Sequence, residues 1–460
     1  MLTKIRNWFR SIRSWFRSIR KKNAQNHHSQ TAPQNPIIIP RSAHCVSRAN
    51  ISKHALNVLY RLHDAGYQAY LVGGGVRDVL LDSHPKDFDV ATNARPEEIQ
   101  SLFRNCRLIG RRFRLAHVHF GYHIIEVATF RANSENKALS PHLVHSEEGM
   151  ILRDNIYGML IDDVYRRDFT VNALYYNIAD FTLLDYVGGL KDLKARCLRM
   201  IGEPRQRYRE DPVRMLRAIR FAAKLGFSIH LDSERPLFEL GALVKQVPSA
   251  RLLDEFMKMF LSGFAEASFS LLRHYGLFIV LFPQAEQCLI KEQGVIAKSF
   301  IRGALLESDK RVHESKPVAL PFLLGAFLWY PVQTRATALM KEGASEFTAF
   351  YEACDWVLQE QQQSVVISKR FSQAIREIWI LQIRLIRRLR KRIPELILHP
   401  RFRAAYDFLL LRASTGDKAV EEVAAWWKTY IEANNDTRVL MEKALQEAGH
   451  THRAKRRKRR

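Results

Sequence analysis

Two aspartates, Asp87 and Asp89, have the spacing most suggestive of chemistry, in the segment LVGGGVRDVLLDSHPKDFDVAT. In an extended strand, positions i and i+2 point to the same face, roughly 6.6 Å apart at ~3.3 Å per residue. Two carboxylates on one face repel each other unless a cation lies between them. Magnesium prefers carboxylate and phosphate oxygens, so the spacing predicts a metal site acting on a phosphate-containing substrate. A solvated strand face is the alternative.

A glycine turn shortly before these aspartates predicts a phosphate-binding element. We expect a strand at 68–72, a turn at Gly73 and Gly74, and a helix at 76–81. Glycine lets the backbone approach a bulky anion, and free N–H groups at a helix N-terminus favour phosphate. Arg77 adds a cation beside them. The segment matches neither the P-loop nor the dinucleotide-binding motif.

The combination of G-G-x-V-R-D and D-x-D resembles the nucleotidyltransferase superfamily that includes DNA polymerase β. It is most similar to the branch shared by tRNA CCA-adding enzymes and bacterial poly(A) polymerases. Three further blocks resemble that branch: Arg166–Leu174 (RRDFTVNAL), Asp185–Asp192 (DYVGGLKD) and Tyr208–Phe227. The resemblance covers about residues 55–285. It implies an α/β nucleotidyltransferase head followed by an all-α neck, body and tail, with two magnesium ions and ATP as substrate.

The second block offers further catalytic candidates. Arg167 can reach triphosphate or ribose oxygens, and the resemblance implies that Asp168 is a catalytic carboxylate beside Asp87 and Asp89. Glu126, on a neighbouring expected strand, competes for the role of third metal ligand. The sequence leaves this choice open, and an ordinary salt bridge is the alternative interpretation of Asp168 and Glu126.

The fourth block predicts how the base is recognised. It indicates a helix with Asp211 as N-cap, Pro212 in the first turn and Gly226 at its end. In the family, protein side chains replace a template, so an arginine donor and a carboxylate acceptor would select adenine. The candidates for nucleotide binding here are Glu210, Asp211, Arg214 and Arg217. A capping motif with surface arginines is the simpler alternative.

Two segments favour polyadenylation over CCA addition. Arg107–Val118 (RLIGRRFRLAHV) and His399–Ala413 resemble poly(A) polymerases, and Arg111, Arg112 and Arg114 could grip the primer or triphosphate. We therefore expect template-independent addition of AMP from ATP to RNA 3′ ends (mRNA, small RNA or tRNA), which promotes RNA turnover in bacteria. A tRNA CCA-adding enzyme is the first alternative. A non-catalytic RNA-binding protein is the second, and it would be expected to lack the carboxylates.

The charge distribution predicts a polyanionic partner. Lys and Arg number 72 against 47 Asp and Glu, a formal charge of +25, with basic residues concentrated at both ends. Residues 1–22 repeat a basic amphipathic heptad that could stack on RNA, lie on the anionic inner membrane face or be a flexible appendage. Five scattered cysteines suit a cytoplasmic protein without disulfides. Nothing in the sequence demands more than a monomer.

The pattern of hydrophobic residues predicts the domain organisation. Mixed α/β periodicity ends near residue 200, and helical periodicity dominates beyond about 205. Residues 133–150 are expected to be a mobile loop, and Pro317–Val332 a buried helix too short to span a bilayer. The expected parts are an N-terminal extension and linker (1–45), catalytic head (46–200), neck for base recognition (201–265), RNA-binding body (266–440) and basic tail (441–460).

Two other clusters have less specific interpretations. Arg384–Arg392 (RLIRRLRKR) could follow an RNA strand or form a solvated helix face. His117, His119 and His123 lack a further ligand at metal-binding spacing, so we expect core or RNA-contacting roles for them.

Overall fold

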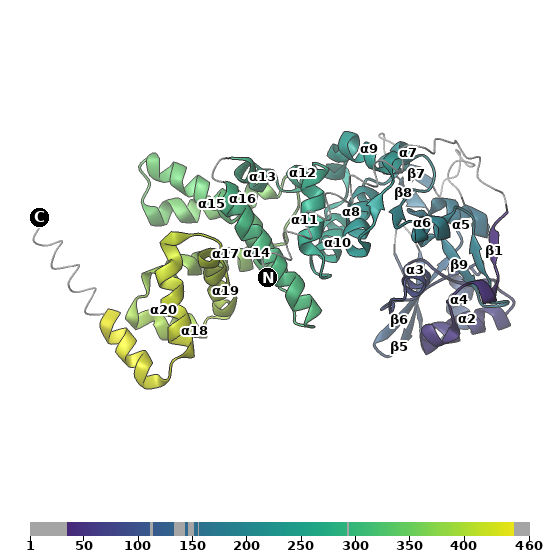
Figure 1. Cartoon of the computed structure of the whole chain (residues 1–460), viewed down its shortest axis with the longest axis horizontal. Helices are drawn as coiled ribbons and strands as arrows, with labels where there is room; N and C mark the ends of the chain where they lie inside the picture. The colour runs from purple at the N-terminus through teal and green to yellow at the C-terminus, as the bar shows by residue number, and fades with distance from the viewer. Residues whose placement is uncertain are drawn as a thin grey trace, which may run out of the picture. The chain divides into compact units, whose positions relative to one another are not determined.

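The computed structural model describes residues 35–110, 114–132, 143–145, 151–154, 156–291 and 294–445. The chain divides into two compact units, Met1–Leu243 and Val244–Arg460, each described by itself (Figure 1). The division falls inside the segment predicted as a neck. The heptads of residues 1–22, residues 446–460 of the predicted basic tail and two primer-binding candidates, Arg111 and Arg112, lie outside the described residues, whereas residues 441–445 are helical.

An eight-stranded sheet organises the first unit, in the order β1-β10-β9-β2-β3-β6-β5-β4. Only β3 and β6 pair in parallel; the other neighbours are antiparallel. The strands are β1 (Ile37–Ile39), β2 (Ala69–Val72), β3 (Asp89–Thr92), β4 (Cys106–Ile109), β5 (Leu115–Phe120), β6 (His123–Thr129), β9 (Leu174–Asn177) and β10 (Leu183–Asp185). The sheet confirms the predicted α/β head.

Two short strands correct the predicted connections. Ile37–Ile39, placed in a linker by the sequence, forms edge strand β1 against β10, because three consecutive isoleucines have high β propensity. Part of the predicted loop 133–150 forms β7 (Leu143–His145), which pairs with β8 (Ile151–Asp154). The rest of that loop lies outside the described residues. A second two-stranded sheet pairs β11 (Cys197–Leu198) with β12 (Ser228–Ile229) in parallel.

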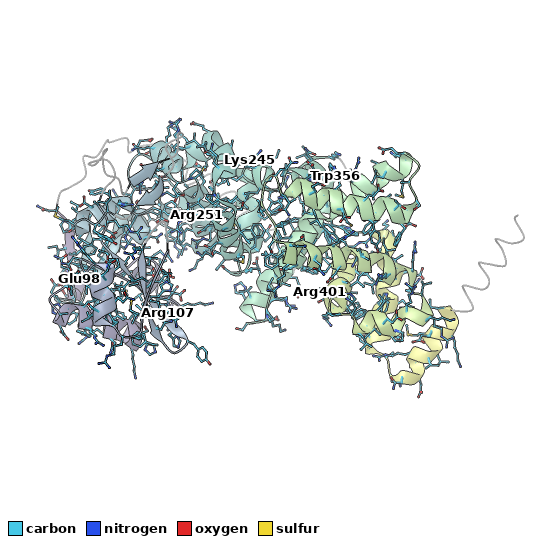
Figure 2. The ribbon with its side chains drawn as sticks, turned by 180° about the vertical axis from the view of Figure 1, so that it is seen from behind. Glu98, Arg107, Lys245, Arg251, Trp356 and Arg401 are labelled. Carbon is cyan, nitrogen blue, oxygen red and sulfur yellow. The ribbon has the colours of Figure 1, made fainter. Side chains whose placement is uncertain are left out.

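Helices of the first unit surround the sheet and lead away from it. Helix α2 begins where the Ser52 side chain accepts the Ala55 N–H, and it buries a stripe containing Val58, Leu59 and Leu62. The helices are α2 (Lys53–Asp64), α3 (Gly74–Leu80), α4 (Pro96–Leu102), α5 (Leu160–Arg166), α6 (Gly189–Lys194), α7 (Pro204–Glu210), α8 (Val213–Leu225) and α9 (Leu231–Leu240). In α4, the Glu98 side chain accepts the Arg95 N–H (Glu98 is labelled in Figure 2).

The described part of the second unit is helical, as predicted. Its core includes Trp379, whose indole N–H donates to the Gly325 carbonyl, and Trp427, which donates to the Leu385 carbonyl. Its helices are α10 (Ser249–Phe260), α11 (Ala265–His274), α12 (Phe278–Leu281), α13 (Pro283–Ile290), α14 (Gly294–His313), α15 (Leu320–Lys341), α16 (Glu346–Gln361), α17 (Lys369–Arg387), α18 (Ile393–Leu398), α19 (Phe402–Ser414) and α20 (Glu421–Glu432).

The apolar stretch near residue 320 forms the buried first half of α15, which confirms the prediction of a buried helix. Within the described residues, no helix has both the length and the apolar character needed to cross a bilayer.

Candidate functional site

The glycine turn follows the predicted strand directly. All four residues of β2 are buried, Gly73 has φ +70°, and α3 starts at Gly74. A Cβ at position 73 would stand 3.4 Å from Asp89 Oδ2 and 3.6 Å from Arg167 Nη1. The positive φ is therefore what favours glycine at this turn, whereas a Cβ would make ordinary van der Waals contact with the carboxylate and the guanidinium.

The two aspartates occupy different positions relative to the strand. β3 begins at Asp89, whereas Asp87 is exposed and precedes the strand. The expectation that a strand already runs from Asp87 is therefore wrong by two residues. Asp89 pairs in parallel register with Glu126 of β6, so these two side chains lie on one face of the sheet. The Glu126 side chain is half-exposed.

The pKa of Asp89 depends on burial and on charged neighbours of both signs. Burial, Glu126 and Asp87 raise the pKa of Asp89 from 3.8 to about 6, although Arg167 and Arg217 oppose this shift. A carboxylate with its pKa raised in this way lacks sufficient compensation for its charged form. The donor set of Asp87, Asp89 and Glu126, all oxygen ligands facing acidic neighbours, therefore fits a hard divalent cation.

Among the described residues, no three His, Cys, Asp or Glu side chains already stand together in a geometry that would hold a metal ion. The histidines near the site do not supply a ligand set. His117 Nε2 lies 3.3 Å from Glu126 Oε1, the His117 and His119 rings are 6.3 Å apart, and His123 lies beside His54. The two magnesium ions thus stay a prediction.

Asp168 differs from Asp89 because donors within the chain form hydrogen bonds with both oxygens of its carboxylate. Oδ2 accepts from Arg217 Nε at 2.7 Å, with Arg217 Nη2 at 2.6 Å. Oδ1 accepts the Phe169 N–H at 2.8 Å and the Asn172 amide at 3.3 Å. Burial by itself raises the pKa of Asp168, but Arg217 and these hydrogen bonds outweigh it and lower the value to about 2. Both oxygens are therefore engaged.

Arg167 is held in place by two side chains that the sequence analysis did not single out. Its Nε donates to Tyr175 Oη at 2.6 Å, and its Nη2 pairs with Asp163 Oδ2 at 3.2 Å. Tyr175 in turn donates to Asp163 at 2.7 Å. This bracing leaves Nη1 directed toward the Gly73 turn.

Arg77 occupies a more interior position than a phosphate ligand at the turn would require. It is 2% exposed; its Nη1 donates to Asn172 at 2.6 Å, and its Nε donates to Asp78 at 2.7 Å. Arg77 does lie beside Gly74, with Nη2 3.5 Å from where a Cβ at Gly74 would be, and it ties α3 to Asn172, which also holds Asp168; its predicted role in nucleotide binding stays a prediction. The periodicity of the sequence could not predict the contact between Arg77 and Asn172, because the two residues are 95 positions apart.

The base-recognition candidates lie where α7 meets α8. Glu210 is buried and accepts from Arg207 Nη1 at 2.7 Å and Arg214 Nη1 at 3.1 Å. Asp211 is also buried. The helix α8 begins at Val213, one residue later than predicted, but Asp211 is non-helical (φ −150°, ψ 89°) and Pro212 already has helical angles (φ −61°, ψ −19°). The predicted end at Gly226, with φ +64°, is confirmed.

Arg214 and Arg217 have different partners although they lie three residues apart on α8. Arg214 reaches Glu210 and the Arg207 carbonyl, whereas Arg217 reaches Asp168. Arg114, the described member of the predicted primer-binding arginines, pairs with Glu97 of α4. The structure thus brings Gly73, Asp89, Glu126 and Arg167 together, with Asp168 and Arg217 close by.

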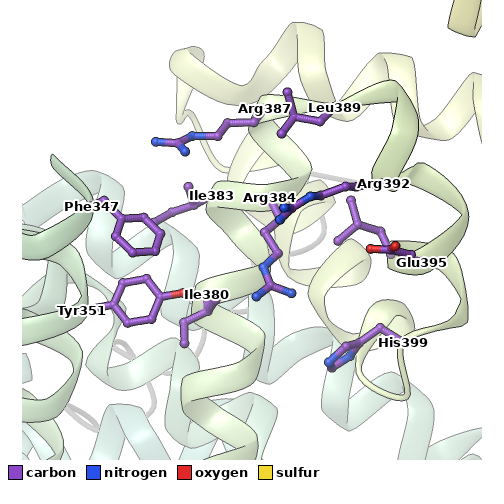
Figure 3. Close-up of a pocket in the computed structure, with 11 residues that line it drawn as sticks. Phe347, Tyr351, Ile380, Ile383, Arg384, Arg387, Leu389, Arg392, Glu395 and His399 are labelled. Atoms are coloured by element: carbon purple, nitrogen blue, oxygen red, sulfur yellow. The ribbon is translucent and has the colours of Figure 1, made fainter.

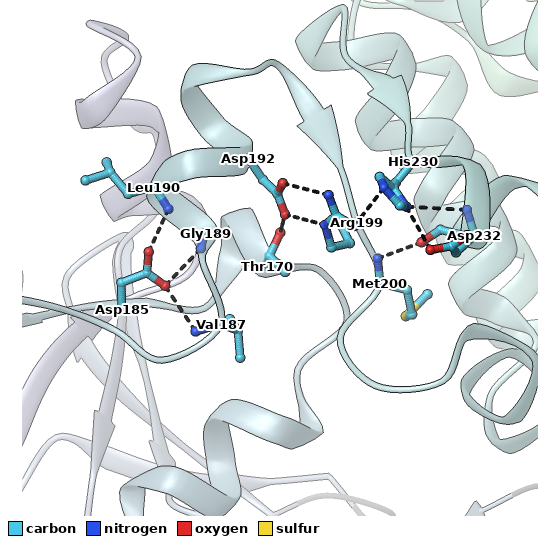
Figure 4. A network of polar contacts seen from close by, with 11 residues as sticks. Thr170, Asp185, Val187, Gly189, Leu190, Asp192, Arg199, Met200, His230 and Asp232 are labelled. Carbon is cyan, nitrogen blue, oxygen red and sulfur yellow. Dashed lines mark hydrogen bonds and ion pairs between the residues drawn. The ribbon is translucent and has the colours of Figure 1, made fainter. Parts of the chain in front are cut away.

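The DYVGGLKD block has a positioning role (Figure 4). Asp185 accepts the backbone N–H groups of Val187, Gly189 and Leu190 at 2.8–3.2 Å. Asp192 accepts from Thr170 and pairs with Arg199 at 3.0 Å. A Cβ at Gly189 would collide with the Thr170 carbonyl oxygen, so glycine permits this packing. The block therefore supports the segment that carries Arg167 and Asp168.

Solved structures share this architecture. A CCA-adding enzyme in complex with CTP has a TM-score of 0.58 at 20% identity, covering 89% of this chain and 90% of that one. A tRNA nucleotidyltransferase complexed with a primer tRNA and an incoming ATP analogue has a TM-score of 0.52 at 22% identity, covering 82% and 98%. The fold is that of a nucleotidyltransferase of the polymerase-β-like class.

Sequence comparisons specify the family. Family models match residues 69–199 ("Poly A polymerase head domain"), 226–289 ("Probable RNA and SrmB- binding site of polymerase A") and 342–460 ("Polymerase A arginine-rich C-terminus"). Poly(A) polymerase I of Escherichia coli O6:H1 is 46% identical over 430 residues, 93% of this chain and 91% of the relative. That of Haemophilus influenzae is 45% identical over 425 residues, 92% and 93%. The chain belongs to the poly(A) polymerase I family.

Proposed function

We propose that this polynucleotide adenylyltransferase transfers AMP from ATP to RNA 3′ ends at the face formed by Asp87, Asp89 and Glu126. The observation that carries this proposal is the parallel register of Asp89 and Glu126 beside the Gly73 turn. Arg167 and Arg217 offset the negative charge of Asp89 only in part, so a positively charged ligand would stabilise it further.

Magnesium fits these residues, because all three offer hard oxygen donors and a bound cation would favour the charged form of Asp89, whose pKa burial and Glu126 raise. Asp87, Asp89 and Glu126 would hold two ions. Bound magnesium would lower the pKa of the attacking 3′-hydroxyl and neutralise charge on the departing pyrophosphate. Glu126 is favoured over Asp168 as the third ligand, because Arg217 and Asn172 already engage the Asp168 oxygens.

Arg167 and the Gly73 turn would bind the triphosphate. The turn brings the backbone close to the site, and Arg167 Nη1 points toward it from a guanidinium fixed by Asp163 and Tyr175. A preorganised cation stabilises charge that develops in the transition state without reorganising during the reaction. The 3′-oxygen would attack the α-phosphorus while pyrophosphate leaves, with no covalent enzyme intermediate and with positioning supplying much of the rate.

Asp211 and Arg214 would select adenine, with Glu210 fixing the Arg214 guanidinium from the other side. An arginine donor facing adenine N1 and a carboxylate acceptor facing its amino group discriminate against the other bases. Arg217, paired with Asp168, would position that carboxylate at the edge of the nucleotide site.

The proposed RNA substrates are broad, because Lys and Arg exceed Asp and Glu by 25 and charge reads the backbone of any RNA. A peripheral association of residues 1–22 with an anionic membrane stays a separate prediction. Vesicle co-sedimentation that is the same with and without residues 1–22 would contradict it.

The test is nucleotide incorporation into an unstructured RNA primer, with magnesium and each of the four labelled triphosphates supplied separately. Long ladders with ATP alone, abolished in Asp87→Ala/Asp89→Ala, would support the proposal. Addition limited to two C and one A on a tRNA lacking its end would instead establish CCA addition. No incorporation on either RNA, with binding retained, would favour a non-catalytic RNA-binding protein.

A further inference from the structure

A pocket of about 160 Å³ in the second unit lies far along the sequence from the candidate active site. Its walls come from α16, α17, the turn after α17 and α18 (Figure 3). The lining combines two aromatic rings, apolar side chains and three arginines: Phe347, Tyr351, Ile380, Ile383, Arg384, Arg387, Leu389, Arg392, Glu395, Leu396 and His399.

We propose that this pocket binds a nucleotide unit of single-stranded RNA, with its base against the Phe347–Tyr351 pair and adjacent phosphates on Arg384, Arg387 and Arg392. The proposal rests on the proposed RNA substrate and adds to it a binding site on the strand that is being extended.

The aromatic pair provides a surface for a base. The Phe347 and Tyr351 rings have centroids 4.3 Å apart, and Phe347 is 49% exposed despite its size. Ile380 and Ile383 continue this apolar wall along α17. A nucleobase covering such a surface would remove it from water, and base–aromatic stacking is a general way to bind single strands without reading sequence.

The arginines supply the charge for phosphates. Within the described residues, the side chains of Arg384, Arg387 and Arg392 have no ion pair, hydrogen bond or ring contact, whereas their neighbours Arg388 and Arg390 pair with Glu422 and Glu442. Figure 3 shows the Arg384 guanidinium between the aromatic rings and His399. Glu395 is the one acidic residue in the lining, so the pocket keeps a net positive charge.

The spacing of these cations favours a strand over a free nucleotide. Arg384 and Arg387 are separated by one helical turn, about 4.5 Å along the axis at ~1.5 Å per residue, and Arg392 comes from a different element. Cations distributed over two elements can contact successive phosphates of a chain. The phosphates of a free nucleotide all lie together at one end of the molecule, so they would not need cations on two elements.

The test measures binding of a fluorescent single-stranded RNA 20-mer to the full chain, without ATP, over a range of salt concentrations. In Arg384→Gln/Arg392→Gln, we expect weaker binding and a smaller slope of log K against log salt, by about 1.4, since each phosphate contact contributes about 0.7 for single strands. Lys369→Gln/Arg370→Gln removes the same charge from the exposed start of α17, outside the pocket, and should retain the wild-type slope.

A second variant tests the aromatic surface independently of charge. Phe347→Leu keeps an apolar side chain at an exposed position, so the fold should be retained, but it should weaken RNA binding about 5-fold or more with an unchanged salt slope.

Wild-type RNA affinity and slope in both pocket variants would overturn the proposal. A raised KM for ATP with unchanged RNA affinity would also overturn it, by identifying a site for the free nucleotide. These outcomes are distinguishable from failure of the proposed function, which would appear as absent ATP incorporation by the wild-type chain.

Discussion

Two aspartates of the first unit, Asp89 and Asp168, have pKa values shifted in opposite directions by their surroundings. Asp89 faces Glu126 and has a pKa raised by burial to about 6, whereas Asp168 faces Arg217 and has a pKa of about 2. Both are largely withdrawn from water, so their partners decide the difference. Asp168 is paired with a cation of the chain, Arg217, whereas the proposed magnesium would supply the positive charge beside Asp89.

The largest expected effect is on catalysis by Asp89. Asp89→Asn should lower kcat by roughly 10³-fold, because it removes a charge from the proposed magnesium site while keeping its size. Primer extension with ATP measures the loss, and Asp64→Asn at the exposed end of α2 is a matched control expected to be fully active. An Asp89→Asn enzyme with wild-type activity would contradict the contrast between Asp89, as a proposed magnesium ligand, and Asp168.

The effects on stability should have opposite signs. Because the pKa of Asp89 rises from 3.8 to about 6 on folding, its contribution is full below pH 3.8 and is lost as the pH rises through 6. Asp89→Asn removes the resulting penalty and should increase the free energy of unfolding at pH 7.5 by about 3 kcal/mol without magnesium.

For Asp168 the sign reverses. Its pKa falls from 3.8 to about 2 on folding, so its contribution is present above pH 3.8 and is lost as the pH falls toward 2. Asp168→Asn should decrease the free energy of unfolding at pH 7.5 by about 2 kcal/mol, since it removes the carboxylate charge that pairs with Arg217. Urea unfolding of both variants checks the pair; shifts of the same sign would contradict this account.

A smaller effect is expected on the pH dependence of magnesium. Only charged Asp89 binds a cation well, and with a pKa of about 6 roughly a quarter of it is charged at pH 5.5. The magnesium concentration that gives half-maximal activity should therefore be about 4-fold higher at pH 5.5 than at pH 7.5. Glu126→Gln removes one cause of the raised pKa and should reduce this ratio. A ratio near one in the wild type would be inconsistent with the raised pKa.

Local sequence patterns predicted the parts of the site that depend on local structure. The apolar run and the glycines were sufficient to place β2 and the Gly73 turn, whereas α3 begins at Gly74, two residues before the predicted start at 76. Three isoleucines between prolines were not recognised as β1, because an edge strand this short has no alternation to detect.

Long-range partners could not be predicted in the same way. Asp168 and Arg217 are 49 positions apart, and Arg77 and Asn172 are 95 apart, so neither pair has a signature in any sequence window. The parallel register of Asp89 and Glu126 likewise depends on how β3 and β6 meet. Asn172 lies inside the RRDFTVNAL block, and this position was the one feature of the sequence that could have indicated its role in holding Arg77 and Asp168.

The most direct test of the contrast between Asp89 and Asp168 is stabilisation by magnesium, measured as the change in Tm on adding the ion at pH 7.5. Wild type and Asp168→Asn should both gain Tm with magnesium, because a ligand that binds the folded state stabilises it. Asp89→Asn and Glu126→Gln should lose most of that gain. Loss of the gain in Asp168→Asn, with the gain retained in Glu126→Gln, would show that Asp168 is the third metal ligand and would contradict the account.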